Sequence, residues 1–294
     1  MEFYQKFKNL VRKTLPNPIR QLCFMYIGGG YHSPIPSQKE IRKYNFNAPL
    51  PKTLPGIDLN DQEQLSLLES FESFYREQPF SDEKTAGLRY YFINGWFGCS
   101  DALLLYCMIR HLNPKKIIEV GSGFSSAVML DTNERFMGNS VHCTFIEPYP
   151  TRLKSLLNPN DEGRVTIHQK RLQDIPLEVF MDLKENDILF IDSSHVAKLN
   201  SDVTYYLHEL LPALASGVYI HIHDILYPFE WPQRFYLDGS SPNEQYMLRA
   251  FLEYNQNFKI VMFNSYLASM KEEEIKKRFP LLLRTPGSIW LKRI

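Results

Sequence analysis

The feature that most constrains the fold is a short apolar run that turns on two glycines and continues into a helical pattern. Residues 117–120 read Ile-Ile-Glu-Val, and the turn is Gly121-Ser122-Gly123. A strand, a glycine turn and a helix in this order form the first half of a nucleotide-type βα unit. The glycines let a ligand approach bare backbone, and the free N–H groups of the helix point toward it. Ser126 stands where a full dinucleotide fingerprint has glycine, so a tight turn without a ligand stays open.

Length and charge bound the class of protein. The chain has 294 residues, which allows one large α/β domain with additions or two small domains. Lys plus Arg and Asp plus Glu are equal at 33 each, which argues against nucleic-acid binding driven by bulk charge. The four cysteines form no C-x-x-C pattern. No apolar run approaches the roughly 18 residues of a membrane helix, and no secretory signal is seen. We therefore expect a cytoplasmic protein.

Residues 1–95 read as a basic, helical and proline-rich extension that packs on a main domain formed by residues 96–294. Apolar residues between Phe3 and Leu15 recur at helical spacing within a basic segment. Such a helix packs on the domain or on a second subunit, which leaves a homodimer open. The alternative is contact with an anionic membrane surface. The prolines of residues 45–58 indicate a linker laid over a surface.

From residue 116 onward, predicted strands and helices alternate, which indicates a parallel, doubly wound sheet. The last two predicted strands enclose a charged helical segment and favour an antiparallel hairpin. The predicted fold is thus α/β, a Rossmann-like seven-stranded sheet that is mostly parallel with a terminal antiparallel strand. The predicted strands are residues 117–120, 141–146, 165–168, 187–191, 218–222, 259–263 and 288–292.

Acids and histidines follow these strands at their carboxyl ends. Glu147 follows the second strand, Asp192-Ser-Ser-His195 the fourth, and His223-Asp224 the fifth. In open α/β sheets, ligands bind outside the carboxyl ends of the strands. We therefore expect Gly121, Glu147, Asp192 and Asp224 to meet in one cleft.

This layout resembles the class I S-adenosylmethionine-dependent methyltransferases. The likeness rests on Glu119-Val-Gly-Ser-Gly123, Glu147, Gln173-Asp174, Asp192 and the closing hairpin. The runs Ile191-Asp-Ser-Ser-His195 and His221-Ile-His-Asp224 are distantly similar to the macrocin-type O-methyltransferases, a bacterial branch associated with glycan and natural-product methylation. The resemblance implies methyl transfer to a hydroxyl of a sugar, glycan or secondary metabolite.

The resemblance also implies where S-adenosylmethionine binds. An acid at the position of Glu147 takes the ribose diol, with a surface cap before Pro148 as the alternative. Glu119 lies near the amino end of the methionine part, or is a buried acid bonded to N–H groups of the turn. Gln173 and Asp174 occupy the turn that often bonds the adenine amine, although a solvated turn is the alternative. Asp101 faces the sulfonium or only caps its helix. The predicted cofactor-binding residues are Asp101, Glu119, Gly121, Ser122, Gly123, Glu147, Gln173, Asp174 and Asp192.

An alcohol acceptor needs a base or a metal that stabilises the alkoxide. His195 is the first candidate base, with Asp192 and His223 as further catalytic candidates; a structural histidine bonded to backbone is the alternative. Asp192, His223 and Asp224 are also candidate ligands of a divalent metal ion. The matching place in the macrocin-type enzymes is an acid pair that binds magnesium, so His223 favours a softer ion. The alternative is that His223 and Asp224 only bond each other.

The aromatic stretch after Asp224 is predicted to cover the acceptor through Tyr227, Trp231 and Tyr236, since aromatic rings suit a sugar or ring face. A hydrophobic flap over the core is the alternative. Two other functions stay open: an NAD-dependent oxidoreductase, against which Ser126 and the terminal hairpin argue, and a non-catalytic cofactor-binding partner protein.

Overall fold

The structure is a computed structural model that describes residues 33–237 and 242–294. The chain divides into two compact units, Pro51–Glu230 with Asn243–Ile294 and Met1–Leu50 with Trp231–Pro242. The described part of the smaller unit contains α3 (Gln38–Lys43) and α12 (Gln233–Leu237), which contact each other. The helix predicted between Phe3 and Leu15 lies outside the described residues.

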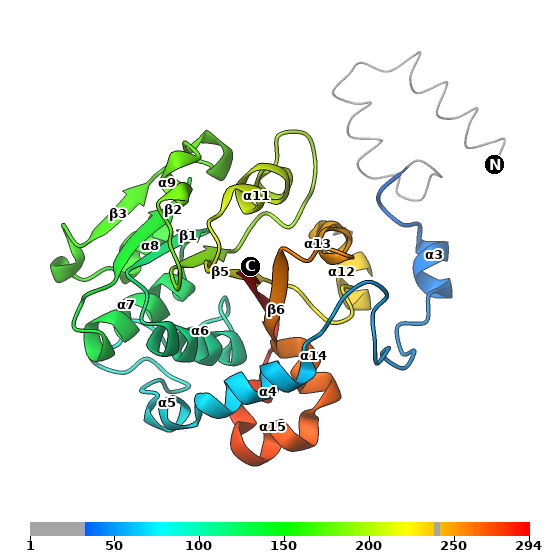
Figure 1. The fold of residues 1–294 in the computed structure, drawn as a ribbon, viewed down its shortest axis with the longest axis horizontal. Helices are drawn as coiled ribbons and strands as arrows, with labels where there is room; N and C mark the ends of the chain where they lie inside the picture. Colours follow the sequence, from blue (N-terminus) through cyan, green and yellow to red (C-terminus); the bar gives the residue numbers. More distant parts are fainter. Residues whose placement is uncertain (1–32, 238–241) are drawn as a thin grey trace. The chain divides into compact units, whose positions relative to one another are not determined.

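The larger unit is built on one seven-stranded sheet with the strand order β3-β2-β1-β4-β5-β7-β6 (Figure 1). The first five strands pair in parallel, and β7 pairs antiparallel with both β5 and β6. The predicted Rossmann-like sheet with a terminal antiparallel strand is confirmed. The strands are β1 (Lys116–Val120), β2 (His142–Ile146), β3 (Val165–His168), β4 (Ile188–Ile191), β5 (Tyr219–His223), β6 (Phe258–Phe263) and β7 (Ser288–Arg293).

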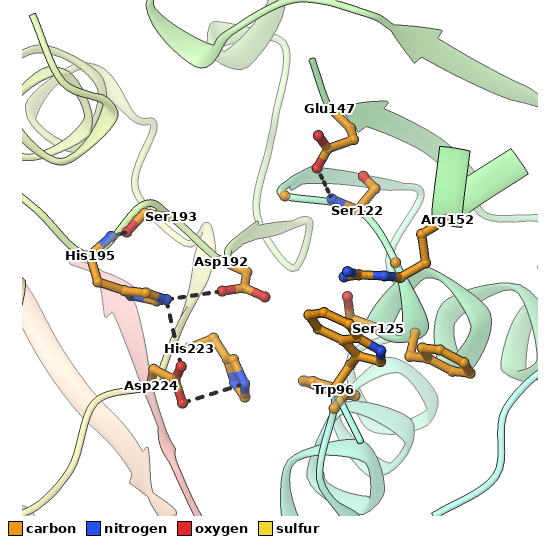
Figure 2. A pocket seen from close by; sticks show the side chains of 14 residues that line it. Trp96, Ser122, Ser125, Glu147, Arg152, Asp192, Ser193, His195, His223 and Asp224 are labelled. Atoms are coloured by element: carbon orange, nitrogen blue, oxygen red, sulfur yellow. Dashed lines mark hydrogen bonds and ion pairs between the residues drawn. The ribbon is translucent and has the colours of Figure 1, made fainter. Parts of the chain in front are cut away.

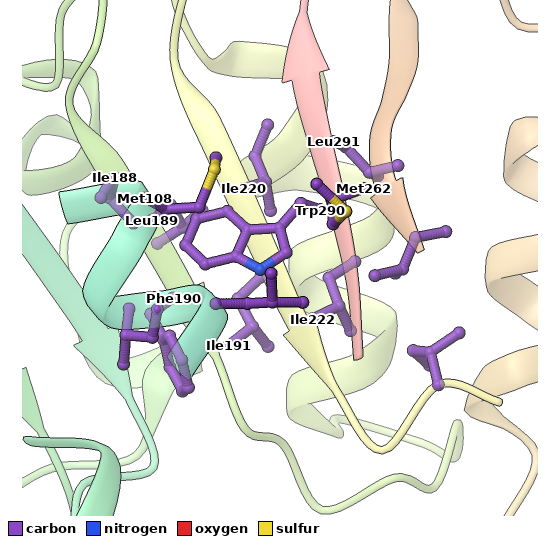
Figure 3. Packing of buried hydrophobic residues seen from close by; sticks show 14 of the residues in the cluster. Met108, Ile188, Leu189, Phe190, Ile191, Ile220, Ile222, Met262, Trp290 and Leu291 are labelled. Carbon is purple, nitrogen blue, oxygen red and sulfur yellow. The ribbon is translucent and has the colours of Figure 1, made fainter. Parts of the chain in front are cut away.

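The central strands are apolar because both faces of the sheet are covered. Every residue of β4 is buried. Figure 3 shows Trp290 of β7 packed near Met108, Ile220 and Met262 in the core of the larger unit. The indole of Trp290 is fully buried. Continuous burial of this kind fixes the strand register, and with it the positions of the residues at the strand ends.

The helices form two groups. In one, α6 packs on α7 and α7 on α8; in the other, the α10–η3–α11 segment packs on α13. The chain between β4 and β5 contains a π-helical turn at η3, between α10 and α11. The helical segments of the larger unit are α4 (Asp61–Ser70), α5 (Glu72–Glu77), α6 (Cys99–Leu112), α7 (Phe124–Phe136), α8 (Thr151–Leu156), η1 (Pro159–Asp161), η2 (Leu172–Asp174), α9 (Glu178–Met181), α10 (Asp202–Tyr205), η3 (Tyr206–Leu210), α11 (Leu211–Ala213), α13 (Glu244–Leu252), α14 (Asn264–Met270), α15 (Glu272–Arg278) and η4 (Pro280–Leu283).

Residues 51–95 contribute apolar side chains to the same core as the sheet. Leu54, Leu68, Phe71 and Phe80 are all buried in it. The segment is therefore continuous with the larger unit, whereas the domain boundary at 95/96 remains a prediction. Within residues 33–237 and 242–294, no helix combines the length and the apolar character needed to cross a membrane.

Candidate active site

A pocket of about 320 Å³ lies at the carboxyl end of the sheet (Figure 2). Its walls come from the segments that follow β1, β2, β4 and β5, from the residues before α6, and from α8. The structure therefore brings the four strand ends together. The lining residues are Trp96, Phe97, Gly121, Ser122, Gly123, Phe124, Ser125, Glu147, Arg152, Asp192, Ser193, His195, His223 and Asp224.

The turn after β1 requires glycine at its first position. Gly121 has φ +81°, and a Cβ built on it would lie 2.0 Å from the carbonyl oxygen of Asp192. This approach is possible because the backbones are tied together: Gly121 N–H donates to Ile146 O at 3.0 Å, and Asp192 N–H donates to Val120 O at 2.8 Å. The result is a pocket wall of bare backbone at the junction of β1 and β4.

Glu147 lies at the rim above this turn, half-buried. Its Oε2 accepts from Ser122 N–H at 3.2 Å, and its Oε1 accepts from Tyr149 N–H at 2.7 Å. Two backbone donors thus fix the carboxylate, which lines the pocket and keeps further lone pairs for other donors; Figure 2 shows the bond from Ser122. A carboxylate held in this way can accept hydrogen bonds from a pair of neighbouring hydroxyls.

Glu119 does not line the pocket. It is fully buried behind the glycine turn, where its carboxyl accepts from Ser125 Oγ at 2.5 Å and from Ser126 Oγ. Burial raises its pKa to about 8, against the lowering effect of the serine hydroxyls. Ser126 Oγ also accepts from Gly123 N–H at 3.0 Å. The serine at the third fingerprint position therefore joins Glu119 to the turn and holds the start of α7.

His195 lies among three carboxylates. Its Nδ1 is 2.7 Å from Glu244 Oε2, and its Nε2 is 3.4 Å from Asp192 Oδ1 and 3.6 Å from Asp224 Oδ2. Burial alone would lower the pKa of His195, but hydrogen bonds to Asp192 and Glu244 raise it to about 11. Burial opposes ionisation of Asp192, yet the hydrogen bond from His195 and nearby positive charges lower the pKa of that carboxyl. At neutral pH the pocket thus holds an imidazolium between carboxylates.

Glu244, the first residue of α13, is the partner of His195 that sequence reasoning missed. Its side chain is fully buried, and Oε1 accepts from Ser193 Oγ at 2.6 Å and from Tyr206 Oη at 2.7 Å. The backbone N–H groups of Asn243 and Glu244 donate to His195 O at 3.1 and 3.2 Å. An acid in the first turn of a helix is common for electrostatic reasons, so nothing in the sequence pattern distinguishes this one.

His223 reaches the pocket from β5 and is nearly buried. Its Nε2 is 3.8 Å from Asp224 Oδ1, and its Nδ1 is 3.9 Å from Asp101 Oδ2. Burial would lower the pKa of His223, but the charges of Asp192, Asp101 and Asp224 raise it. His221, by contrast, is stacked on the Phe190 ring at 4.0 Å between centroids, and burial keeps its pKa well below the ordinary value.

Asp101 lies behind the pocket rather than on its wall. Its Oδ1 accepts from Ser288 Oγ at 2.6 Å, from Gly287 N–H at 3.3 Å and from the side-chain amide of Asn264. Burial raises its pKa. These contacts join the start of α6 to β7 and to α14.

Several predicted site residues lie outside the pocket lining. Asp174 forms an ion pair with Arg171, at 2.8 Å from Nε to Oδ2. Gln173 donates to Asn200 O at 2.7 Å, and its Oε1 is buried without a hydrogen-bond partner among the described residues. The Tyr227 hydroxyl donates to Pro51 O. Trp231 and Tyr236 belong to the smaller unit.

The metal prediction finds no support in the arrangement of side chains. Over residues 33–237 and 242–294, no group of three or more His, Cys, Asp or Glu side chains is arranged to hold a metal ion. Asp192 and Asp224 instead flank His195, and His223 Nδ1 is buried without a hydrogen-bond partner among these residues. The residues present do not fit a metal centre, and we derive no step through one.

Comparison with known proteins places the chain in a family. Residues 118–225, which contain most of β1, all of β2 to β5 and the four strand ends of the pocket, match the model of a methyltransferase domain. The chain belongs to the class I S-adenosylmethionine-dependent methyltransferases and is an enzyme of that class. This match favours a methyltransferase over the oxidoreductase alternative; the macrocin-type branch remains a prediction.

A relative with a similar sequence is an uncharacterized protein of Archaeoglobus fulgidus. It is 34% identical over 192 residues, which are 63% of this chain and 85% of that protein. The two chains therefore belong to one family, and the similarity extends over most of the archaeal protein. The description of that protein names no activity.

Two methyltransferases serve as examples of the solved structures to which this chain is similar. The O-methyltransferase TomG from Streptomyces achromogenes is 13% identical, with 81% of this chain and 91% of that chain covered and a TM-score of 0.43. The Podospora anserina methyltransferase PaMTH1 is 13% identical, with 83% and 100% covered and a TM-score of 0.45. Similarity at this level carries no argument about substrate.

Proposed function

We propose that the protein transfers the methyl group of S-adenosylmethionine to a hydroxyl oxygen of a small-molecule or glycan acceptor, with His195 as the general base. The observation that carries this proposal is the position of His195 Nε2 in the pocket, 3.4 Å from Asp192 and 3.6 Å from Asp224. A hydroxyl loses its proton as it is methylated, so the reaction needs a proton acceptor at the pocket.

The pocket residues fit S-adenosylmethionine in shape and charge. Glu147 offers carboxylate lone pairs to the two ribose hydroxyls, and the bare backbone at Gly121 allows close approach. The carboxylates of Asp192 and Asp224 suit a ligand that carries an ammonium and a sulfonium group. The unpartnered Oε1 of Gln173 is our candidate acceptor for the adenine amine. When bound, the cofactor supplies an electrophilic methyl group with a thioether leaving group.

In the proposed step, Nε2 of His195 takes the hydroxyl proton while the acceptor oxygen bonds to the methyl carbon. Bound S-adenosylmethionine would supply that methyl group, and its sulfur would keep the electron pair of the carbon–sulfur bond as the thioether leaves. His195 must be neutral to act, yet Asp192, Asp224 and Glu244 hold it protonated in the unliganded pocket. Positive charge bound against Asp192 and Asp224 offsets this effect and lowers the pKa of His195 toward the range of a base.

Glu244 completes the arrangement as a positioning residue. With Nδ1–H donating to Glu244, the imidazole presents Nε2 to the pocket, and the buried carboxylate stabilises the imidazolium that forms during transfer. Ser193 and Tyr206 hold that carboxylate in place through its other oxygen. Tyr227, which the sequence predicts to contact the acceptor, is a weak candidate because its hydroxyl donates to Pro51 O.

The test uses His195→Ala and His195→Gln. We expect methyl transfer from labelled S-adenosylmethionine to an extract of the source organism to fall about 10²–10⁴-fold, while calorimetric affinity for S-adenosylhomocysteine stays within about threefold, since His195 acts on the acceptor proton. His208→Ala, an exposed histidine of η3, is the matched control. Unchanged transfer in both His195 variants would remove the histidine from the mechanism.

A further inference from the structure

The wall of the pocket opposite Asp192 carries a cation that the reaction chemistry described so far does not use. Arg152 of α8 lies with its guanidinium 3.4 Å above the centre of the Trp96 ring. Both residues line the pocket, and Figure 2 shows Arg152 pointing into it, toward Asp192 on the other wall. Among the residues that the structure describes, no carboxylate forms an ion pair with Arg152.

Trp96 is exposed but fixed. The residue is 64% exposed. Its backbone is nonetheless held tightly, because Asn94 Oδ1 accepts from Trp96 N–H at 2.8 Å and from Phe97 N–H at 2.9 Å. Asn94 Nδ2 also donates to Phe97 O at 3.0 Å. The indole is therefore a rigid platform for the guanidinium.

The guanidinium is also close to the glycine turn. A Cβ built on Gly123 would lie 3.3 Å from Arg152 Cδ and 3.6 Å from its Nη1. The charge of Arg152 contributes to the lowered pKa of Asp192, so the two groups share one electrostatic environment. The pocket thus presents the carboxylates of Asp192 and Asp224, together with the imidazoles beside them, at the ends of β4 and β5, and the guanidinium of Arg152 on the wall formed by α8.

We propose that Arg152, stacked on Trp96, binds the carboxylate of the amino-acid end of S-adenosylmethionine. This inference rests on the proposed function. A zwitterionic ammonium and carboxylate matches opposite charges on opposite walls, and a planar guanidinium presents paired N–H donors to a carboxylate. The ring of Trp96 keeps that plane oriented and supplies a cation–π contact.

The experiment compares two ligands that differ only in this carboxylate: S-adenosylhomocysteine and its decarboxylated form. We expect the wild-type protein to bind the first more tightly by on the order of ten- to hundredfold in calorimetry. Arg152→Ala should abolish that preference by weakening S-adenosylhomocysteine alone, and Arg152→Lys should retain part of it. Trp96→Ala should reduce the preference more than Trp96→Phe, which keeps a ring.

Lys154→Ala is the matched control, because Lys154 is an exposed cation on the same helix outside the pocket lining. It should leave both affinities unchanged. A preference that persists in Arg152→Ala, or an equal loss for both ligands, would overturn the assignment while leaving the proposed function intact. Failure of the wild-type protein to bind S-adenosylhomocysteine would instead overturn the proposed function, and this assignment with it.

Discussion

At the scale of single residues, the chemistry of the pocket depends on how charge is distributed around one imidazole. Carboxylates from three segments face His195: Asp192 after β4, Asp224 after β5 and Glu244 from α13. The neighbouring His223 has a pKa raised by Asp192, Asp101 and Asp224. These carboxylates therefore favour the protonated form of the His195 imidazole. In the proposed mechanism, the pKa of His195 depends on how far other cations neutralise this negative charge.

This arrangement predicts a pH effect of Glu244→Gln. The substitution keeps an acceptor near Nδ1 but removes one negative charge, so the pKa of His195 falls. Activity requires neutral His195 and rises with pH, so the midpoint of that rise should move to lower pH. The plateau rate should drop about 10- to 100-fold because the imidazolium is less stabilised. Rates measured across a pH series check both effects.

Tyr206→Phe serves as the control for the Glu244 variant. It removes one hydrogen bond to Oε1 of Glu244 but leaves the carboxylate charge in place, so the midpoint should stay where it is in the wild-type protein. Affinity for S-adenosylhomocysteine should change by less than about threefold in both variants. An unshifted midpoint in Glu244→Gln would show that Glu244 does not act through His195.

At the scale of elements, the sequence predicted the parallel strands and the residues at their ends because burial and glycine turns are local signals. It did not predict Glu244 as a partner of His195, since 49 positions separate them. For Glu119 the sequence left open a place near the cofactor or a buried position, and the structure shows the side chain buried and bonded to the serines of α7. Hydrophobic periodicity predicts where a strand or helix lies, but it does not predict which way an acidic side chain on that element points.

The turn between β1 and α7 gives a prediction at this scale. Gly121→Ala should destabilise the protein by about 2–4 kcal/mol, because the added Cβ meets the Asp192 carbonyl at 2.0 Å and φ is +81°. Gly138→Ala is the matched control, with φ +61° and no atom within 4 Å of the added Cβ, and should cost about 1 kcal/mol. Urea unfolding measures both, and equal losses would contradict the steric explanation.

At the scale of the whole molecule, a buried ion network joins residues before α6 to the methyltransferase sheet. Arg89 Nη1 lies 2.7 Å from Asp131 Oδ1 in α7, and Nη2 lies 2.9 Å from Asp161 Oδ1 in η1. Backbone N–H groups of Arg89 and Tyr90 also donate to Asp131 Oδ2 at 2.8 and 2.9 Å. The network holds the segment that carries Trp96 and Phe97 against the main fold.

Removal of this cation should therefore be costly. Arg89→Ala leaves two nearly buried carboxylates without their partner, and we expect a loss of about 3–5 kcal/mol in urea unfolding. Arg76→Ala is the control, because its ion pair with Glu72 lies on the surface of α5 and should contribute less than about 1 kcal/mol. Comparable losses for the two variants would show that the Arg89 network does not stabilise the fold as inferred.

The tight contact between the residue 121 turn and the end of β4 also bears on how such enzymes diversify. On that side a bound ligand would contact main-chain atoms, whose positions change little when most side chains are substituted. Substitutions elsewhere in the pocket can change acceptor selectivity and leave this part of the proposed donor-binding site intact. Mutant libraries that keep Gly121 and the proposed donor-binding residues Glu147, Arg152, Asp192 and Asp224, and randomise the remaining lining positions, should retain donor binding in most members, even where selectivity has changed.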